Sequence, residues 1–248
     1  MLRKIINNVL MFFGYKISRK IQKQMLSKKF LENYNKSKNL SSFNLEFFLF
    51  LELSLDYLFK RNRIEGDIVE CGVFKGANCR FICDYLKSIN YENINIFLYD
   101  TFEGMPCASS NDINIFTKKN YNFYLKKMQK NNEVDNFYKY ENIENVKKLL
   151  FQTNYNKNKI HFIKGLVEET IPKTIPNKIS LLILDTDYYD STKHELQYLY
   201  PLVEKGGIII IDDYGTWSGV KKAVDEYFDN LNDFKSFIDH KTIFLIKS

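Results

Sequence analysis

The stretch Leu-Leu-Ile-Leu-Asp-Thr-Asp at residues 181–187 is an apolar run that ends in two carboxylates one residue apart. A second run of the same kind, Ile-Ile-Ile-Ile-Asp-Asp, occupies residues 208–213. Continuous apolar runs of this length are typical of parallel strands that are buried on both faces. The two runs therefore predict strands over 179–185 and 207–212 in a parallel sheet.

Both predicted strands end in acids, which we expect to converge at one edge of the sheet: Asp185, Asp187, Asp212 and Asp213. In open parallel sheets, ligands bind outside the carboxyl ends of the strands. Carboxylates in such a small volume repel one another strongly unless a cation or a proton relieves them. The sequence therefore indicates a divalent metal site at this edge.

Length and composition favour one large α/β domain, because 248 residues with 45% hydrophobic and 27% charged side chains are ordinary globular material. The net charge of +6 comes from lysines spread along the chain, so nucleic acid is not indicated, whereas an anionic substrate or membrane surface fits equally well. The cysteines lack zinc-ribbon spacing, and we expect reduced thiols in a cytoplasmic protein: Cys71, Cys79, Cys83 and Cys107.

The first 25 residues form a separate feature, in which apolar residues recur at helical spacing between lysines and arginines. The apolar part is too short to span a bilayer, and no small-residue cleavage site follows it. This pattern predicts a basic amphipathic helix that packs on its own domain or on a second copy, or lies on an anionic membrane surface. We expect a homo-oligomer, with a helical extension at 1–60 and the main domain at 61–248.

Strand and helix patterns alternate along the rest of the chain, which predicts a doubly wound sheet. Further strands are expected at 67–73, 94–101 and 160–165, helices at 43–58, 79–88, 143–150 and 192–203, and a terminal antiparallel hairpin at 234–239 and 242–247. Thr192 and Glu195 match a capping box for the last of these helices, and Gly206-Gly207 would provide the turn after it. Residues 111–140 have no strand pattern and are interpreted as a helical insertion or lid.

The turn after the first strand contains Gly72 and Gly76, which allow a close approach of the backbone to a ligand. It lacks both Gly-x-Gly-x-x-Gly and Gly-Lys-[Ser/Thr], which argues against dinucleotide and triphosphate binding. Glu70 suits an ammonium or sulfonium group, or else it is a strand-end acid paired with Lys75 or Arg63. Asp100, at the end of the next strand, has the position of an acid that accepts ribose hydroxyls.

Several motifs together resemble the macrocin O-methyltransferase family over residues 64–228. They are Glu-Cys-Gly-Val-Phe-Lys-Gly (70–76), Asp-Thr-Phe-Glu-Gly-Met-Pro (100–106), Phe-Ile-Lys-Gly (162–165), Glu-Thr-Ile-Pro (169–172), Leu-Asp-Thr-Asp-Tyr-Tyr-Asp-Ser-Thr (184–192), Leu-Tyr-Pro (199–201), Gly-Gly (206–207) and Asp-Asp-Tyr-Gly-Thr-Trp-Ser-Gly-Val-Lys-Lys-Ala-Val-Asp (212–225). Members of this family are S-adenosylmethionine- and divalent-metal-dependent enzymes that methylate sugar hydroxyls on natural products. Thr186 stands where the family often has Gly, and Leu166 replaces a common Trp.

The resemblance implies a Rossmann-like class I methyltransferase fold and a role for each matching residue. Cofactor-binding residues would be Glu70, Gly72, Asp100, Thr101 and Gly165; metal ligands would be Asp185, Asp212 and Asp213; the general base would be Asp187. Oxygen-only ligands suit Mg²⁺ best. The implied reaction is Mg²⁺-assisted methyl transfer to a hydroxyl of a sugar or glycan precursor. Apart from the resemblance, the basic charge and the first 25 residues favour an enzyme in the cytoplasm or peripherally at the inner membrane surface.

The sequence also leaves other functions open. The acceptor could be phenolic or catecholic, and the fold could instead serve a nicotinamide-dependent oxidoreductase or a scaffold that lost its chemistry. Tyr214 and Trp217 would flank a sugar ring or simply pack beneath the insertion. The histidines are expected to be structural or solvent-facing: His161, His194 and His240.

Overall fold

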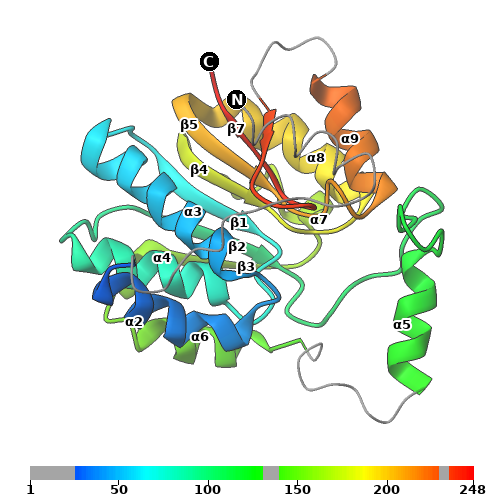
Figure 1. Ribbon diagram of the computed structural model, residues 1–248, viewed down its shortest axis with the longest axis horizontal. Helices are drawn as coiled ribbons and strands as arrows, with labels where there is room; N and C mark the ends of the chain where they lie inside the picture. Colours follow the sequence, from blue (N-terminus) through cyan, green and yellow to red (C-terminus); the bar gives the residue numbers. More distant parts are fainter. Residues whose placement is uncertain (1–25, 131–139, 229–234) are drawn as a thin grey trace, which may run out of the picture.

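One mixed sheet of seven strands organises the protein, in the order β3-β2-β1-β4-β5-β7-β6 (Figure 1). The computed structural model describes residues 26–130, 140–228 and 235–248. The strands are β1 Asp67–Cys71, β2 Ile96–Asp100, β3 Ile160–Lys164, β4 Ile179–Leu184, β5 Val203–Ile211, β6 Lys235–Phe237 and β7 Ile243–Ile246. The first five run parallel, and β7 is antiparallel to both β5 and β6. This confirms the doubly wound sheet with a terminal antiparallel hairpin.

Helices cover both faces of the sheet (Figure 1). One layer contains α2 Lys28–Ser37, α3 Leu45–Leu55, α4 Ala77–Ser88 and α6 Ile143–Phe151, and the other contains α7 Val167–Thr170, α8 Tyr189–Leu199 and α9 Ser218–Phe228. A further helix, α5 Tyr121–Lys130, stands beyond the carboxyl edge of the sheet (Figure 1).

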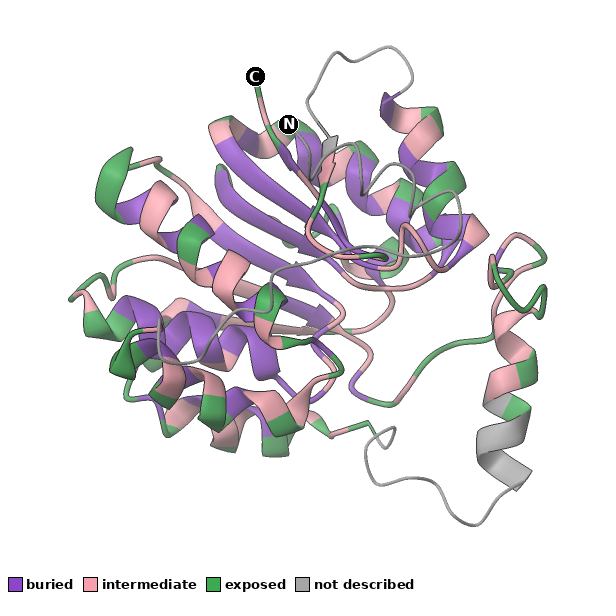
Figure 2. Ribbon diagram, in the orientation of Figure 1, coloured by how far each residue is buried: buried purple, intermediate pink, exposed green. Residues whose placement is uncertain are grey.

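The residues of β4 contribute to two hydrophobic cores, one on each face of the sheet. All residues of this strand are buried, as the colouring of the central strands in Figure 2 shows. Leu181 and Ile183 join the core under α3 and α4, whereas Leu182 and Leu184 join the core under α8 and α9. Because successive side chains point to opposite faces, a continuous apolar run is what such a strand requires. Burying each such side chain contributes about 1.5–3 kcal/mol.

The region between α8 and β5 differs from the sequence prediction. Helix α8 ends at Leu199, a short 3-10 turn containing Pro201 follows, and β5 begins at Val203. The pair Gly206-Gly207 was predicted as the turn after the helix, and this was wrong, because both residues lie inside β5. There the pairing register with β4 shifts and Gly206 has a φ of +82°. The glycines therefore serve an irregular segment of a strand.

The N-terminal part of the described chain packs into the main core. The predicted helix at 43–58 is found as α3, continued by a π-helical turn over Asp56–Arg61. The ring of Phe30 on α2 lies 5.9 Å from that of Phe81 on α4. The division at residue 60 stays a prediction, and the predicted amphipathic helix lies in residues 1–25, outside the described part. None of the described helices is long and apolar enough to cross a membrane.

Candidate active site

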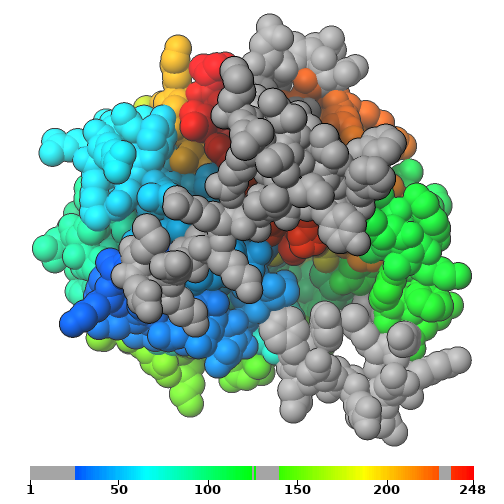
Figure 3. Space-filling view, in the orientation of Figure 1, coloured from blue at the N-terminus to red at the C-terminus, as the bar shows by residue number. Residues whose placement is uncertain are grey.

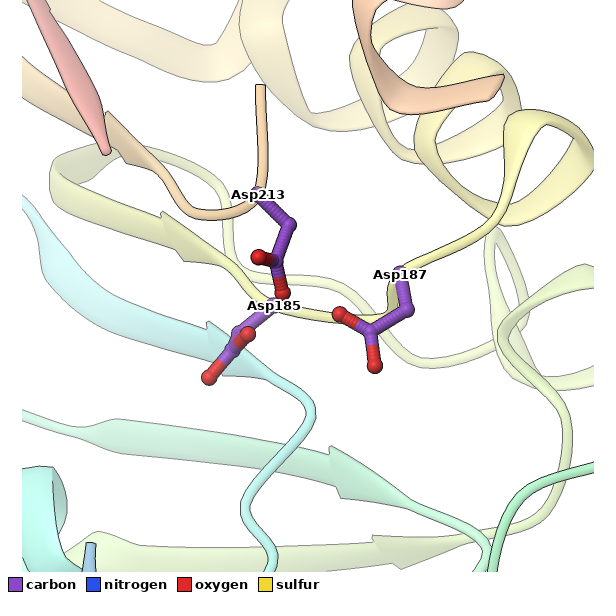
Figure 4. A group of neighbouring side chains, drawn as sticks. All are labelled: Asp185, Asp187 and Asp213. Atoms are coloured by element: carbon purple, nitrogen blue, oxygen red, sulfur yellow. The ribbon is translucent and has the colours of Figure 1, made fainter. Parts of the chain in front are cut away.

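The chain segments that follow β4 and β5 bring three carboxylates together at the carboxyl edge of the sheet. One oxygen each of Asp185, Asp187 and Asp213 lies within 4.8 Å of the others, with Asp185 and Asp187 on the segment after β4 and Asp213 on the segment after β5 (Figure 4). Asp187 Oδ1 is buried and has no hydrogen-bond partner among the described residues. Three carboxylates at this spacing fit a hard divalent cation.

The backbone around these acids is held in an uncommon conformation. Asp187 and Asp213 have positive φ values of 66° and 56°, which aspartate tolerates better than most residues. Thr186 fixes the turn between Asp185 and Asp187, because its hydroxyl contacts Ser191 Oγ at 2.9 Å and Glu195 Oε1 at 3.0 Å. Unusual backbone angles of this kind persist where the surroundings hold them in place, and they cluster at functional sites.

Burial and mutual repulsion govern the protonation of the cluster. Burial, together with the charge of Asp212, raises the pKa of Asp185 well above its usual range. Burial and the neighbouring Asp213 do the same for the pKa of Asp187. Burial raises the pKa of Asp212 to about 6, although Lys241 opposes the shift. An added cation would favour the charged forms and lower these pKa values.

Asp212 is placed differently from the other three acids. Its Oδ2 accepts a hydrogen bond from Lys241 Nζ at 2.5 Å, and its Oδ1 accepts one from the Thr242 hydroxyl. The structure therefore groups Asp187 with Asp185 and Asp213, whereas the sequence analysis put Asp212 in the ligand set and made Asp187 the base. Asp185 and Asp213 belong to both sets, and the separate roles of Asp187 and Asp212 stay predictions.

Beside the acids, the turn after β1 forms the expected cofactor end of the site. Gly72 has a φ of +86°, and a Cβ there would lie 2.0 Å from the carbonyl oxygen of Asp185. Only glycine therefore lets this turn pass so close to the end of β4. Glu70 is fully buried and accepts a hydrogen bond from Asn78 Nδ2 at 3.1 Å, while its Oε2 has no partner among the described residues. Burial raises the pKa of Glu70 to about 8, although the bond from Asn78 opposes the shift.

Asp100, the predicted ribose acceptor, organises the same turn. Its Oδ2 accepts hydrogen bonds from the backbone N–H groups of Val73 at 2.7 Å and Phe74 at 2.9 Å. Thr101 donates to the Gly104 carbonyl at 2.7 Å, and the N–H of Gly165 donates to the carbonyl of Asp100 at 3.0 Å. All the predicted cofactor residues therefore lie at or next to the carboxyl ends of β1, β2 and β3, and their binding roles stay predictions.

Three aromatic rings form a wall near the acids: Tyr121 from the insertion, Tyr188 and Trp217. The ring centroid of Tyr121, at the start of α5, lies 4.8 Å from that of Trp217 and 5.3 Å from that of Tyr188. Burial and the nearby charge of Asp187 raise the pKa of the Tyr121 phenol. Tyr214 does not join the wall, since its hydroxyl bonds Asp225 at 2.7 Å. In Figure 3 the green segment that carries α5 forms one edge of the visible face.

Sequence reasoning missed three residues that shape the site: Lys241, Tyr121 and Asp112. Asp112 Oδ1 accepts the N–H of Tyr189 at 2.8 Å and so caps α8 from 77 residues away. Helix α8 begins at Tyr189, so the predicted capping box at Thr192 was wrong. No local pattern marks Lys241 among so many lysines.

The histidines and cysteines take no part in the cluster. Nε2 of His194 bonds the Ile171 carbonyl at 2.9 Å, that of His161 contacts Asn95 at 3.2 Å, and His240 is exposed. The cysteines are all free, and three of them are buried.

This sheet order, with a tight turn after β1 and acids after β4 and β5, defines the class I methyltransferase fold. The solved structure of the O-methyltransferase NovP has the same architecture, with a TM-score of 0.71 at 21% identity over 87% of this chain and 88% of that one. The family described as macrocin-O-methyltransferase (TylF) matches residues 55–246. The chain therefore belongs to the macrocin O-methyltransferase family, which confirms the resemblance seen in its motifs.

Two relatives show the level of similarity. Mycinamicin III 3''-O-methyltransferase of Micromonospora griseorubida is 27% identical over 169 residues, which cover 68% of this chain and 63% of that protein. The 8-demethyl-8-(2,3-dimethoxy-alpha-L-rhamnosyl)-tetracenomycin-C 4'-O-methyltransferase of Streptomyces olivaceus is 25% identical over 174 residues, covering 69% and 59%. The matched part thus spans about three fifths of the length of these relatives.

Proposed function

We propose that this chain is an S-adenosylmethionine-dependent O-methyltransferase that acts on a hydroxyl of a sugar or glycan precursor, assisted by Mg²⁺. The observation that carries the proposal is the cluster of Asp185, Asp187 and Asp213 beside the turn of Glu70 and Gly72. Family membership supports the reaction class. A relative whose name specifies a rhamnosyl substrate supports the sugar acceptor over a phenolic one.

The cofactor would be held at the carboxyl ends of β1 and β2. The unpartnered Oε2 of Glu70 would accept a hydrogen bond from the ammonium group of its methionine part. Asp100 would accept the ribose hydroxyls, since each carboxylate oxygen can take more than one donor. The close approach permitted by Gly72 would bring this cofactor next to Asp185. Positioning of this kind is the main task of an in-line methyl transfer.

The acceptor hydroxyl would bind between the acids and the aromatic wall. A bound Mg²⁺ on Asp185, Asp212 and Asp213 would supply charge that orients the hydroxyl oxygen and lowers its pKa. Asp187 would take the hydroxyl proton as the new carbon–oxygen bond forms and the methyl–sulfur bond breaks. Tyr121 and Trp217 would exclude water and give the sugar ring an apolar surface.

We infer the cellular location and the oligomeric state of the enzyme from its sequence. The enzyme would act in the cytoplasm as a homo-oligomer, with peripheral contact to the inner membrane surface through its basic, amphipathic first 25 residues.

Calorimetric titration of the full chain with S-adenosylmethionine, with and without Mg²⁺ and with NADH as the control ligand, tests the proposal. Micromolar binding of S-adenosylmethionine and no binding of NADH is the expected result. Glu70→Ala should weaken that binding at least tenfold, whereas Glu103→Ala, on an exposed side chain nearby, should leave it unchanged. Binding of NADH without binding of S-adenosylmethionine would contradict the methyltransferase proposal and support the oxidoreductase alternative.

A further inference from the structure

Lys241 bonds Asp212, a carboxylate that the sequence analysis assigned to the metal site. Lys241 Nζ lies 2.5 Å from Asp212 Oδ2 and 3.9 Å from Asp213 Oδ1. The pair is sheltered, with the Lys241 side chain 19% exposed and that of Asp212 2% exposed. A sheltered ion pair that also meets a second acid of the cluster is unlike the exposed surface pairs, which contribute little.

The backbone of Lys241 is fixed by its own turn, between β6 and β7. Asp239 Oδ1 accepts the N–H groups of Lys241 and Thr242, each at 2.9 Å. The Lys241 carbonyl in turn accepts the N–H of Gly215 at 2.9 Å. A Cβ on Gly215 would lie 2.2 Å from the His240 carbonyl oxygen, so this glycine lets the turn press against the chain just after Asp213.

The side chain of Lys241 also contacts an aromatic ring. Its ammonium lies 4.9 Å from the centre of the Phe43 ring, at a cation–π distance. Phe43 belongs to the segment before α3 and is itself buried. The ammonium therefore contacts both an aromatic ring and Asp212.

A divalent cation on Asp212 would place a second positive charge on a carboxylate that this ammonium already holds. Asp212 Oδ2 is bonded to Lys241, and its Oδ1 is bonded to Thr242. A metal that took Asp212 as a ligand would have to displace the ammonium or share its oxygen. Two positive centres on one oxygen repel each other, most strongly in a sheltered site.

We propose that Lys241 is a built-in counter-ion that competes with the divalent cation for Asp212. In the metal-free protein the ammonium neutralises part of the acid cluster and keeps Asp212 in place. Binding of the metal to Asp212 requires the ammonium to withdraw, which weakens metal binding until other ligands are present. The inference rests on the cation of the proposed function and adds the residue that regulates access to it.

The test measures Mn²⁺ binding to the full chain by the electron paramagnetic resonance signal of free Mn²⁺, without acceptor. Lys241→Met is expected to bind Mn²⁺ at least tenfold more tightly than the unsubstituted chain. Lys241→Gln removes the charge but keeps a hydrogen-bond donor. It should also bind Mn²⁺ more tightly than the unsubstituted chain. Lys221→Met is the matched control, because Lys221 pairs with Asp225 on α9, and its Mn²⁺ affinity should not change.

Asp212→Asn identifies the carboxylate for which the two cations compete. In the Asp212→Asn background, Lys241→Met should no longer tighten Mn²⁺ binding. Equal or weaker Mn²⁺ binding by both Lys241 variants, with their folding verified by thermal unfolding, would overturn the inference and leave the proposed cation standing. Absence of Mn²⁺ binding from every protein in the set would overturn both, while S-adenosylmethionine titration would still report separately on the methyltransferase class.

Discussion

Asp187 is the residue on which the proposed chemistry depends most directly. It lies in the acid cluster, has a buried oxygen without a partner in the described chain, and sits in a left-handed backbone conformation. Asp187→Asn removes the base while keeping the size of the side chain. We expect kcat to fall by about 10²–10⁴-fold, with the affinity for S-adenosylmethionine within about twofold.

The matched control for this substitution is Asp190→Asn, three residues further along and exposed. Its kcat should stay near that of the unsubstituted enzyme. A methyl-transfer assay gives kcat, and calorimetry gives the cofactor affinity. A near-normal rate for Asp187→Asn would remove Asp187 as the base and leave it as a cation ligand.

Glu70 makes stability depend on pH. Burial raises its pKa from 4.5 to about 8 in the folded protein, so between these values the unfolded chain loses a proton that the folded chain retains. The free energy of unfolding therefore falls as pH rises through this window, by up to about 1.4 kcal/mol per pH unit from this group. Glu70→Gln should abolish that part of the slope.

Urea unfolding of both proteins between pH 5 and pH 8, without cofactor, gives the comparison. The difference in unfolding free energy between them isolates Glu70 from the other buried acids. As pH rises, the unfolding free energy of Glu70→Gln should increase steadily relative to that of the unsubstituted chain. A constant difference would mean that Glu70 ionises at its ordinary pKa in the folded protein.

At the scale of elements, α8 depends on a residue from the insertion. Asp112 is fully buried and accepts the N–H of Tyr189 and both the N–H and hydroxyl of Ser109. It thereby caps α8 and ties the insertion to it. Asp112→Ala should lower the free energy of unfolding by roughly 1–3 kcal/mol, measured by urea unfolding.

Asp112→Asn retains an oxygen acceptor and should lose less stability than Asp112→Ala. Asp190→Ala removes an exposed acid from the first turn of α8 and should change stability by less than about 1 kcal/mol. Equal losses from Asp112→Ala and Asp190→Ala would show that the cap contributes nothing beyond its charge near the helix terminus.

The strands could be predicted from the sequence because their signal is local. Strand β4 is an apolar run, and its burial on both faces follows from that alone. The cap of α8 could not be predicted, because its acceptor lies 77 residues away along the chain. Gly206 was misassigned for a similar reason: its positive φ serves an irregular strand rather than a turn. Local patterns thus determine the elements, whereas tertiary contacts decide where some of them begin and end.

At the scale of the whole molecule, the sheet topology converts separate motifs into one site. Residues after β1 and β4 become neighbours because these strands pair directly, and β5 lies on the other side of β4. This explains why the acids Asp185, Asp187 and Asp213 could be expected to meet from the sequence alone. The partner of Asp212 could not be expected, because Lys241 reaches the site from a turn of the antiparallel hairpin.

Since the site joins three strands of the central sheet, its ligands should stabilise the whole fold. A ligand at one hundred times its dissociation constant adds about 2.7 kcal/mol to the free energy of unfolding. For a chain of this size that corresponds to a rise in Tm on the order of 5–10 °C. We expect S-adenosylhomocysteine and Mg²⁺ each to raise Tm, in a thermal unfolding experiment with either ligand alone and with both. Asp185→Asn should retain the rise caused by S-adenosylhomocysteine and lose most of the rise caused by Mg²⁺. A variant that keeps both rises would place the metal away from Asp185, and a protein that shows neither would contradict the site as a whole.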